Sequence, residues 1–163
     1  MQHVFLINPH AGKQNHAARI YTMAEHLRTR HGLCCTCLLT SRPGGAESLA
    51  RETAQSGDPV RLYACGGDGT VSEVANGIAG YPNAAMTVIP AGTGNDFIKT
   101  IGTPREWREA LEFILTHPAR PVNSGMMNDR FFLNVGGAGF DVMVLDFANA
   151  ARKRLSGIGS YLY

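Results

Sequence analysis

A short apolar run, a loop and a stretch of helical periodicity follow one another repeatedly along the first part of the sequence. The apolar runs lie at 3–7, 33–40, 60–65 and 85–90. They are apolar almost throughout rather than alternating, which is typical of strands buried on both faces of a parallel sheet. The pattern therefore predicts an α/β fold, with an open parallel sheet that carries helices on both faces.

Helices are expected between these runs, from about 17 to 30, from 46 to 55, and up to Ile78. A short helix should follow "GTGND". Pro104 suits the first turn of a further helix, "PREWREALEFILTH", because proline is tolerated where the helix N–H has no partner. We expect that helix to stop at Pro118.

The character of the sequence changes near residue 119. The segment "ARPVNSGMMNDRFFLNVGGAGFDVMV" predicts two strands joined near Asn128-Asp129, a hairpin candidate with no intervening helix. We place a domain boundary between Thr116 and Val122.

The boundary divides the chain into an α/β domain at 1–120 and the beginning of a β-rich domain at 121–163. The second segment is too short to form a core of its own, so we expect the chain to be truncated within that domain. The apolar strands at 121–145 should then either seek a partner, for example by forming a homodimer, or be disordered.

Composition and charge limit the classes of function. The chain has 15 basic and 13 acidic residues, so we expect no nucleic-acid partner on grounds of charge. The start "MQHVFLINPH" lacks the basic segment and apolar run of a signal peptide. No apolar run approaches the roughly 18–20 residues of a membrane span, so we expect a soluble, cytoplasmic chain.

The cysteines are read as reduced thiols packed in strands. Cys34, Cys35 and Cys37 lie in one predicted strand and Cys65 in another. Because neighbours in a strand point to opposite faces, Cys34 would point away from the other two. A zinc or redox site is the alternative.

The loop after the third predicted strand reads Gly66-Gly67-Asp68-Gly69-Thr70. Glycines let a phosphate approach the backbone, and the following helix supplies free N–H groups and the positive end of its dipole. Asp68 would repel a bare triphosphate, but Mg²⁺ binds one or two carboxylates together with phosphate oxygens. The loop, which is not a P-loop, therefore predicts a Mg-nucleotide site with Asp68 on the metal; a simple helix cap is the alternative.

The next loop, "PAGTGNDF", repeats the combination of a strand, small residues and a helix start. It supplies the hydroxyl of Thr93 and the polar pair Asn95 and Asp96. Asp96 could polarise an attacking hydroxyl or orient metal-bound water, although simple capping explains the loop equally well. The two earlier loops add the weaker candidates Asn8, Lys13, Thr40 and Arg42.

"GGDGTVSEVANGI" followed by "PAGTGNDF" resembles the diacylglycerol kinase catalytic-domain family, which includes bacterial lipid kinases and sphingosine kinases. "NPHAGK" is similar to the family's Asn-Pro-x-x-Gly opening, and "FFLNVGGAGFDVMV" resembles its segment after the domain junction. The likeness covers essentially the whole chain. It implies a Rossmann-like, phosphofructokinase-like nucleotide domain and ATP-dependent phosphorylation of a lipid hydroxyl, such as that of diacylglycerol, at the inner face of a membrane.

The resemblance also implies roles by position. Asp68 and Asp96 would belong to the catalytic centre, with Asp68 as the Mg²⁺ ligand, and Glu73 would either face the nucleotide or lie on the helix surface. The family's general base is expected beyond Tyr163. Ala11 stands where a serine is frequent, so one hydroxyl contact to phosphate would be missing. The implied ATP contacts are Asn8, Thr40, Gly66, Gly67, Asp68, Gly69, Thr70, Val71, Ser72 and Thr93.

Two other functions remain open at this point. The GGDGT element also occurs in NAD kinases, although "GTGNDF" does not resemble their second motif or the Gly-Ser-x-Asn-Ala pattern of sphingosine kinases. This favours a glycerolipid or polyprenyl alcohol as acceptor. A non-catalytic nucleotide-binding module is the other alternative, and the fragment alone is expected to be inactive. The basic run at 152–154 is either a solvated helix face or a contact with anionic lipid, and His10 and His16 are expected at the surface.

Overall fold

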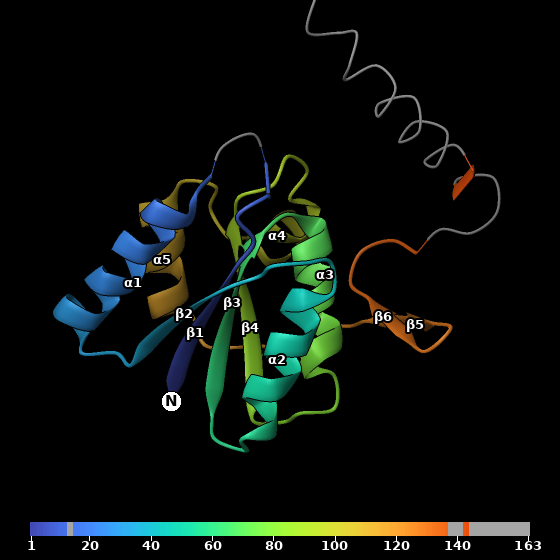
Figure 1. Ribbon diagram of the computed structural model, residues 1–163, viewed down its shortest axis with the longest axis horizontal. Helices are drawn as coiled ribbons and strands as arrows, with labels where there is room; N and C mark the ends of the chain where they lie inside the picture. The colour runs from blue at the N-terminus through green and yellow to red at the C-terminus, as the bar shows by residue number, and fades with distance from the viewer. Residues whose placement is uncertain (13–14, 137–141, 144–163) are drawn as a thin grey trace, which may run out of the picture.

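A computed structural model of the chain describes residues 1–12, 15–136 and 142–143 (Figure 1). Strands β1 (Gln2–Ile7), β2 (Cys35–Leu39), β3 (Val60–Gly66) and β4 (Ala84–Pro90) form a parallel sheet in the order β2-β1-β3-β4. The predicted open parallel sheet is confirmed. Lys13 and the basic run at 152–154 lie outside the described residues.

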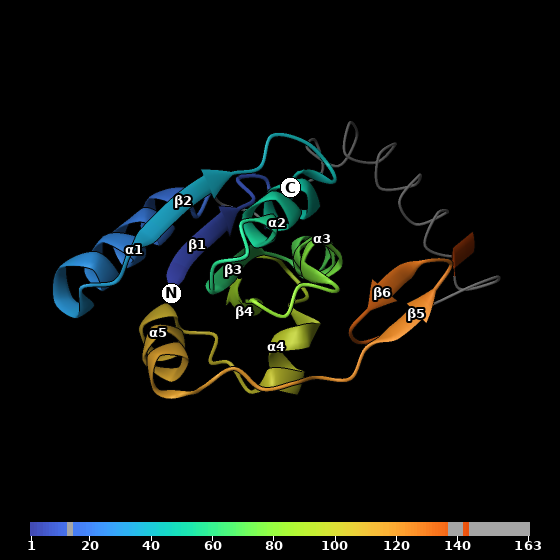
Figure 2. The same ribbon diagram turned by 90° about the horizontal axis from the view of Figure 1, so that it is seen from below.

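Helices cover both faces of this sheet, as predicted. Helices α1 (Ala17–His31) and α5 (Trp107–Thr116) pack on one face. Helices α2 (Gly45–Gln55), α3 (Asp68–Ile78) and α4 (Asp96–Ile101) pack on the other (Figure 2). The result is a three-layer arrangement with a separate apolar core on each side of the sheet.

Strand β1 shows why the apolar runs are continuous. Val4 and Leu6 point into the core under α2 and α3, whereas Phe5 and Ile7 point into the core under α1 and α5. All four side chains are at most 3% exposed. Because neither face of the strand meets water, every position favours an apolar residue.

The predicted start of the helix at Pro104 is wrong. Helix α5 begins at Trp107, and Glu106 is its N-cap. The Glu106 carboxylate accepts hydrogen bonds from the backbone N–H of Arg108 at 2.7 Å and of Glu109 at 3.2 Å. These bonds satisfy the free N–H groups of the first turn, so the cap fixes the start and Pro104 lies in the irregular segment before it.

The predicted hairpin is present. Strands β5 (Gly125–Met127) and β6 (Arg130–Phe132) are antiparallel. Asn128 and Asp129, the two residues that join them, have φ angles of 48° and 61°. Positive φ at both central residues is typical of the tight turn that suits strand twist, and asparagine and aspartate tolerate it well.

The cysteines are free thiols. Cys35 and Cys65 are buried, Cys37 is half-buried and Cys34 is exposed. Burial raises the pKa of Cys35, Cys37 and Cys65, which keeps these thiols protonated at neutral pH. None of the helices that the structure describes combines the length and apolar character needed to cross a membrane.

His3 makes the free energy of unfolding depend on pH. Its side chain is 5% exposed, and Nδ1 lies 2.8 Å from the Tyr63 hydroxyl. Burial is the main cause that lowers the pKa of His3, and the positive charge of Arg61 adds to it. The unfolded chain therefore binds a proton more readily than the folded one.

We therefore expect the free energy of unfolding to fall as the pH drops below about 6.5, the ordinary histidine pKa, towards the lowered pKa of folded His3. Urea unfolding at pH 7.5 and pH 5.0 measures the effect. His3→Gln should reduce this loss on acidification. If His3→Gln and the unchanged protein lose the same free energy, His3 is not the responsible group.

Candidate active site

The loops that follow β1, β3 and β4 meet at the carboxyl edge of the sheet, which is the upper edge in Figure 1. The backbone N–H of Ala91 donates to the Gly66 carbonyl at 3.0 Å, and that of Asn8 donates to the Cys65 carbonyl at 3.0 Å. In open α/β sheets, ligands bind at this edge. The fold thus brings together the predicted loops that begin at Asn8, Gly66 and Pro90.

These loops touch through glycine backbone. A Cβ atom on Gly92 would lie 2.3 Å from the Cα of Gly67, and one on Gly12 would lie 2.3 Å from the Ala91 carbonyl oxygen. Gly12 also has a φ of 74°, which favours glycine. No larger residue fits at these contacts unless the loops separate, so the glycines set the spacing of the three loops.

The N-terminus of α3 faces open space. Among the residues that the structure describes, no side chain caps it, and Asp68 and Gly69 are exposed. A Cβ atom on Gly69 would meet nothing within 4 Å. Because the first N–H groups of a helix lack intrahelical partners and carry the positive end of its dipole, a phosphate can approach here.

Asn8 and Thr70 join the first loop to α3. The Asn8 side-chain amide donates from Nδ2 to Thr70 Oγ1 at 3.1 Å, and Asn8 Oδ1 accepts from the His10 backbone N–H at 3.0 Å. Thr70 is buried, and a Cβ atom on Gly66 would lie 2.2 Å from its hydroxyl oxygen. Gly66 therefore makes room for a buried hydroxyl that anchors the loop.

Asp68 is the first residue of α3, but its side chain caps a different helix, α4. Its Oδ1 accepts the backbone N–H of Asp96 at 2.7 Å and so caps α4. Its Oδ2 faces Gly94, 2.7 Å from the place that a Cβ atom on Gly94 would occupy. One carboxylate oxygen thus joins the two glycine-rich loops, and the other lies beside Gly94 of the loop after β4.

Asp96 lies beside this point. Its Oδ2 would be 3.7 Å from a Cβ atom on Gly94, the same place that Asp68 Oδ2 approaches. Its Oδ1 accepts from Lys99 Nζ at 2.6 Å in an exposed ion pair. Such a pair contributes little to stability, but it orients the Asp96 carboxylate and balances its charge.

The carboxylates fit a magnesium ion that is shared with phosphate. No cluster of three or more His, Cys, Asp or Glu residues that could hold a metal occurs within the part of the chain that the structure describes. Mg²⁺ is usually bound through one or two carboxylates, phosphate oxygens and waters rather than by a full protein cage. Asp68 is the described residue best placed for that role.

Two polar residues of this site were not assigned a role from the sequence. Asn95 has a φ of 51°, donates to the Gly92 carbonyl at 2.6 Å and accepts the Gly92 N–H at 3.1 Å. Asparagine next to glycine at a helix start is a signal for this turn. Lys99 could have been found from its spacing, three residues after Asp96 on a helix.

The loop that follows β2 lies farther from the start of α3 than the other three loops do. Thr40 is buried at the end of β2, two strands from β3 in the sheet order. Glu73 extends from α3 to this loop, where its carboxylate accepts the N–H groups of Gly44 and Ala46 at 3.0 Å each. The Glu73 carboxylate therefore caps the N-terminus of α2, whereas no side chain in the described part of the structure caps that of α3.

The remaining candidates differ in exposure. Val71 has its side chain in the core and its N–H bonded to the Gly67 carbonyl at 3.1 Å. Ser72 and Thr93 are exposed. His10 is exposed and His16 half-buried.

Comparisons with known proteins agree with this geometry. A model of the diacylglycerol kinase catalytic domain matches residues 2–127. The chain is 35% identical over 146 residues to the "Probable lipid kinase YegS-like" of Chromohalobacter salexigens, covering 88% of this chain and 44% of that protein. It is 31% identical over 166 residues to the diacylglycerol kinase of Bacillus subtilis, covering 96% and 52%.

A solved structure has the same fold. The crystal structure of a diacylglycerol kinase from Bacillus anthracis str. Sterne matches with a TM-score of 0.66 at 30% identity, covering 82% of this chain and 46% of that one. The chain spans about half the length of these relatives. The family model covers most of the chain and the solved relative shares its sheet, so this chain belongs to the diacylglycerol kinase catalytic-domain family.

Proposed function

We propose that this chain is the ATP-binding part of a lipid kinase that transfers the γ-phosphoryl group of ATP to a lipid hydroxyl, such as that of diacylglycerol. The observation that carries the proposal is the uncapped N-terminus of α3, which lies between closely packed glycines and beside Asp68. Residues 1–120 form the nucleotide domain in this proposal. Residues 121–163 begin the domain that binds the lipid.

The triphosphate would lie against the N–H groups that open α3. Gly67 and Gly69 leave room for its oxygens, and Thr70 and Asn8 hold the loop in place. Further nucleotide contacts would come from Thr40, Ser72 and Thr93. These groups orient the γ-phosphate for in-line attack, and positioning of this kind supplies much of the acceleration in phosphoryl transfer.

Asp68 would hold Mg²⁺ through Oδ2, since Oδ1 is engaged by the Asp96 N–H. A metal held there would neutralise charge on the phosphate oxygens. Asp96, which lies close to Asp68 and is oriented by Lys99, would orient the acceptor hydroxyl or a metal-bound water. The general base of the transfer would lie in the second domain.

The acceptor is a lipid in this proposal, so the protein would work as a peripheral protein at the inner face of a membrane. An assay with radiolabelled ATP tests the activity directly. The protein as its gene encodes it is incubated with Mg²⁺ and, in separate reactions, with diacylglycerol in vesicles and with NAD. We expect label in the lipid. Label in NAD instead, or in neither acceptor despite ATP binding, would refute the lipid kinase.

The hairpin and its surroundings expose apolar side chains. Val122, Met126 and Val135 are 50%, 63% and 86% exposed. We expect this 163-residue chain to self-associate through them, because an exposed apolar strand edge readily pairs with another chain. Light scattering across a concentration series measures the association. A strict monomer at all concentrations would contradict the expectation.

A further inference from the structure

The β5–β6 hairpin is held against α2 and α3 by directional polar contacts. We propose that Asn76 is a positioning residue that, together with the Glu47–Arg130 ion pair, sets the place of the hairpin relative to the phosphate loop. Asn76 would thereby act on the rate of phosphoryl transfer and not on nucleotide affinity. The proposal rests on the lipid kinase function proposed above.

Asn76 pairs with β6 in the way that a neighbouring strand would. Its Nδ2 donates to the Phe131 carbonyl at 2.9 Å, and its Oδ1 accepts the Phe131 N–H at 2.9 Å. Nδ2 also donates to the Ser72 carbonyl at 2.9 Å, which fixes the side chain on its own helix. Asn76 is 8% exposed, so losing one partner would leave buried polar groups unpaired.

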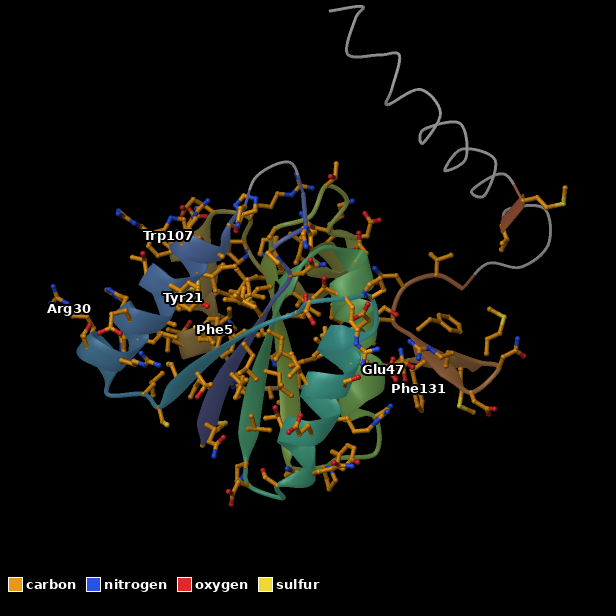
Figure 3. The ribbon with its side chains drawn as sticks, viewed as in Figure 1. Phe5, Tyr21, Arg30, Glu47, Trp107 and Phe131 are labelled. Atoms are coloured by element: carbon orange, nitrogen blue, oxygen red, sulfur yellow. The ribbon has the colours of Figure 1, made fainter. Side chains whose placement is uncertain are left out.

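The ion pair lies beside this contact. Arg130 Nη1 donates to Glu47 Oε2 at 2.7 Å, and Arg51 Nη2 donates to Glu47 Oε1 at 2.8 Å. The Glu47 side chain is 17% exposed. Figure 3 shows Glu47 of α2 and Phe131 of β6 at the junction between the helices and the hairpin. Two helices therefore hold two successive residues of one strand.

Helix α3 leads directly into the site. Helix α3 starts at Asp68, and Asn76 lies about two turns further along it, roughly 12 Å by the helical rise. The chain beyond β6 also contacts α4, where Thr100 Oγ1 donates to Asn134 Oδ1 at 3.3 Å. The hairpin is thus attached to the two helices that begin at Asp68 and Asp96.

Directional contacts suit a positioning role better than apolar packing does. Met126 and Met127, on the partner strand β5, are 63% and 39% exposed. Hydrogen bonds fix a strand in one register, whereas apolar surfaces tolerate sliding. Moving the hairpin would move the lipid hydroxyl relative to the γ-phosphate, and a displacement of about 1 Å in such a geometry can cost about a hundredfold in rate.

The test compares the Asn76→Ala and Asn83→Ala variants of the full-length protein. Asn83 is a control of the same residue type, because its Nδ2 also donates to two backbone carbonyls, those of Ala54 and Asp58, and it has no side-chain hydrogen bond to the described residues of the hairpin. We expect Asn76→Ala to lower kcat for diacylglycerol at least tenfold while the Kd of Mg-ATP stays within twofold. Asn83→Ala should leave both values within twofold, measured at a temperature where both variants are folded.

A charge reversal tests the ion pair separately. Glu47→Arg and Arg130→Glu should each lower kcat, and the double variant should restore it, because the new carboxylate at 130 would again face guanidinium groups at 47 and 51. Equal kcat in Asn76→Ala and Asn83→Ala, or no rescue by the double reversal, would overturn the proposal.

Hydrogen exchange at the Phe131 amide separates this proposal from the proposed function. The amide should exchange slowly in the unchanged protein and at least tenfold faster in Asn76→Ala, whatever the acceptor of the kinase is. Fast exchange in the unchanged protein would overturn the positioning role on its own. An unchanged protein that phosphorylates no lipid would refute the function and, with it, the predicted effect on kcat.

Discussion

Gly92→Ala is expected to weaken Mg-ATP binding at least tenfold and to lower the free energy of unfolding by about 1–3 kcal/mol, the usual cost of overpacking. The added Cβ atom would lie 2.3 Å from the Gly67 Cα, so the loops after β3 and β4 must move apart. That movement breaks the spacing between the N-terminus of α3 and the carboxylates of Asp68 and Asp96.

Titration calorimetry with Mg-ATP and urea unfolding measure the two effects. Gly69→Ala is the matched control for stability, because a Cβ atom there meets nothing within 4 Å and alanine favours a helix. Gly69→Ala should leave the free energy of unfolding unchanged or slightly higher. If Gly92→Ala binds Mg-ATP as tightly as the unchanged chain, contact between the two loops does not shape the nucleotide site.

Asp68→Asn is expected to remove the dependence of ATP binding on Mg²⁺ and to raise the Kd of Mg-ATP about 10–100-fold, a loss of about 1.4–2.7 kcal/mol. The asparagine oxygen can still accept the Asp96 N–H that Oδ1 now accepts at 2.7 Å, so the cap on α4 and the fold should persist. The change removes the negative charge that would bind the metal.

Calorimetric titrations with ATP in the presence of Mg²⁺ or of EDTA measure this dependence. Asp129→Asn is a matched control, since it removes the same charge at an exposed position of the hairpin turn where asparagine is favoured. The control should keep the Kd of the unchanged chain in both conditions. An equal response to Mg²⁺ in Asp68→Asn and in the control would exclude Asp68 as the metal ligand.

The sheet could be predicted from the sequence because burial on two faces leaves a local signal. Continuous apolar runs such as 3–7 and 60–65 follow from cores on both sides of each strand. The turn at Asn128 and Asp129 was predictable for a similar reason, because its residue types match its backbone angles. The start of α5 was not, since the Glu106 cap competes with Pro104 within a few residues and both are reasonable starts.

The loops that form the site could be predicted from the sequence, but the side-chain contacts between them could not. The glycines and Asp68 marked the loop, because few residue types permit close approach of a phosphate. Three contacts join residues that are 27 to 55 positions apart in the sequence. Asp68 caps α4, Glu73 caps α2, and Asn76 pairs with Phe131. Such contacts depend on how helices pack on the sheet, which leaves no pattern within any one segment.

A crystal structure of this chain with ATP and magnesium would be the most direct examination of the site. It should place the phosphates against the first N–H groups of α3, beside Gly67 and Gly69, with the metal ion bound to Asp68. Phosphates bound at another helix, with the opening of α3 in contact with solvent alone, would contradict both the nucleotide site and the kinase built on it.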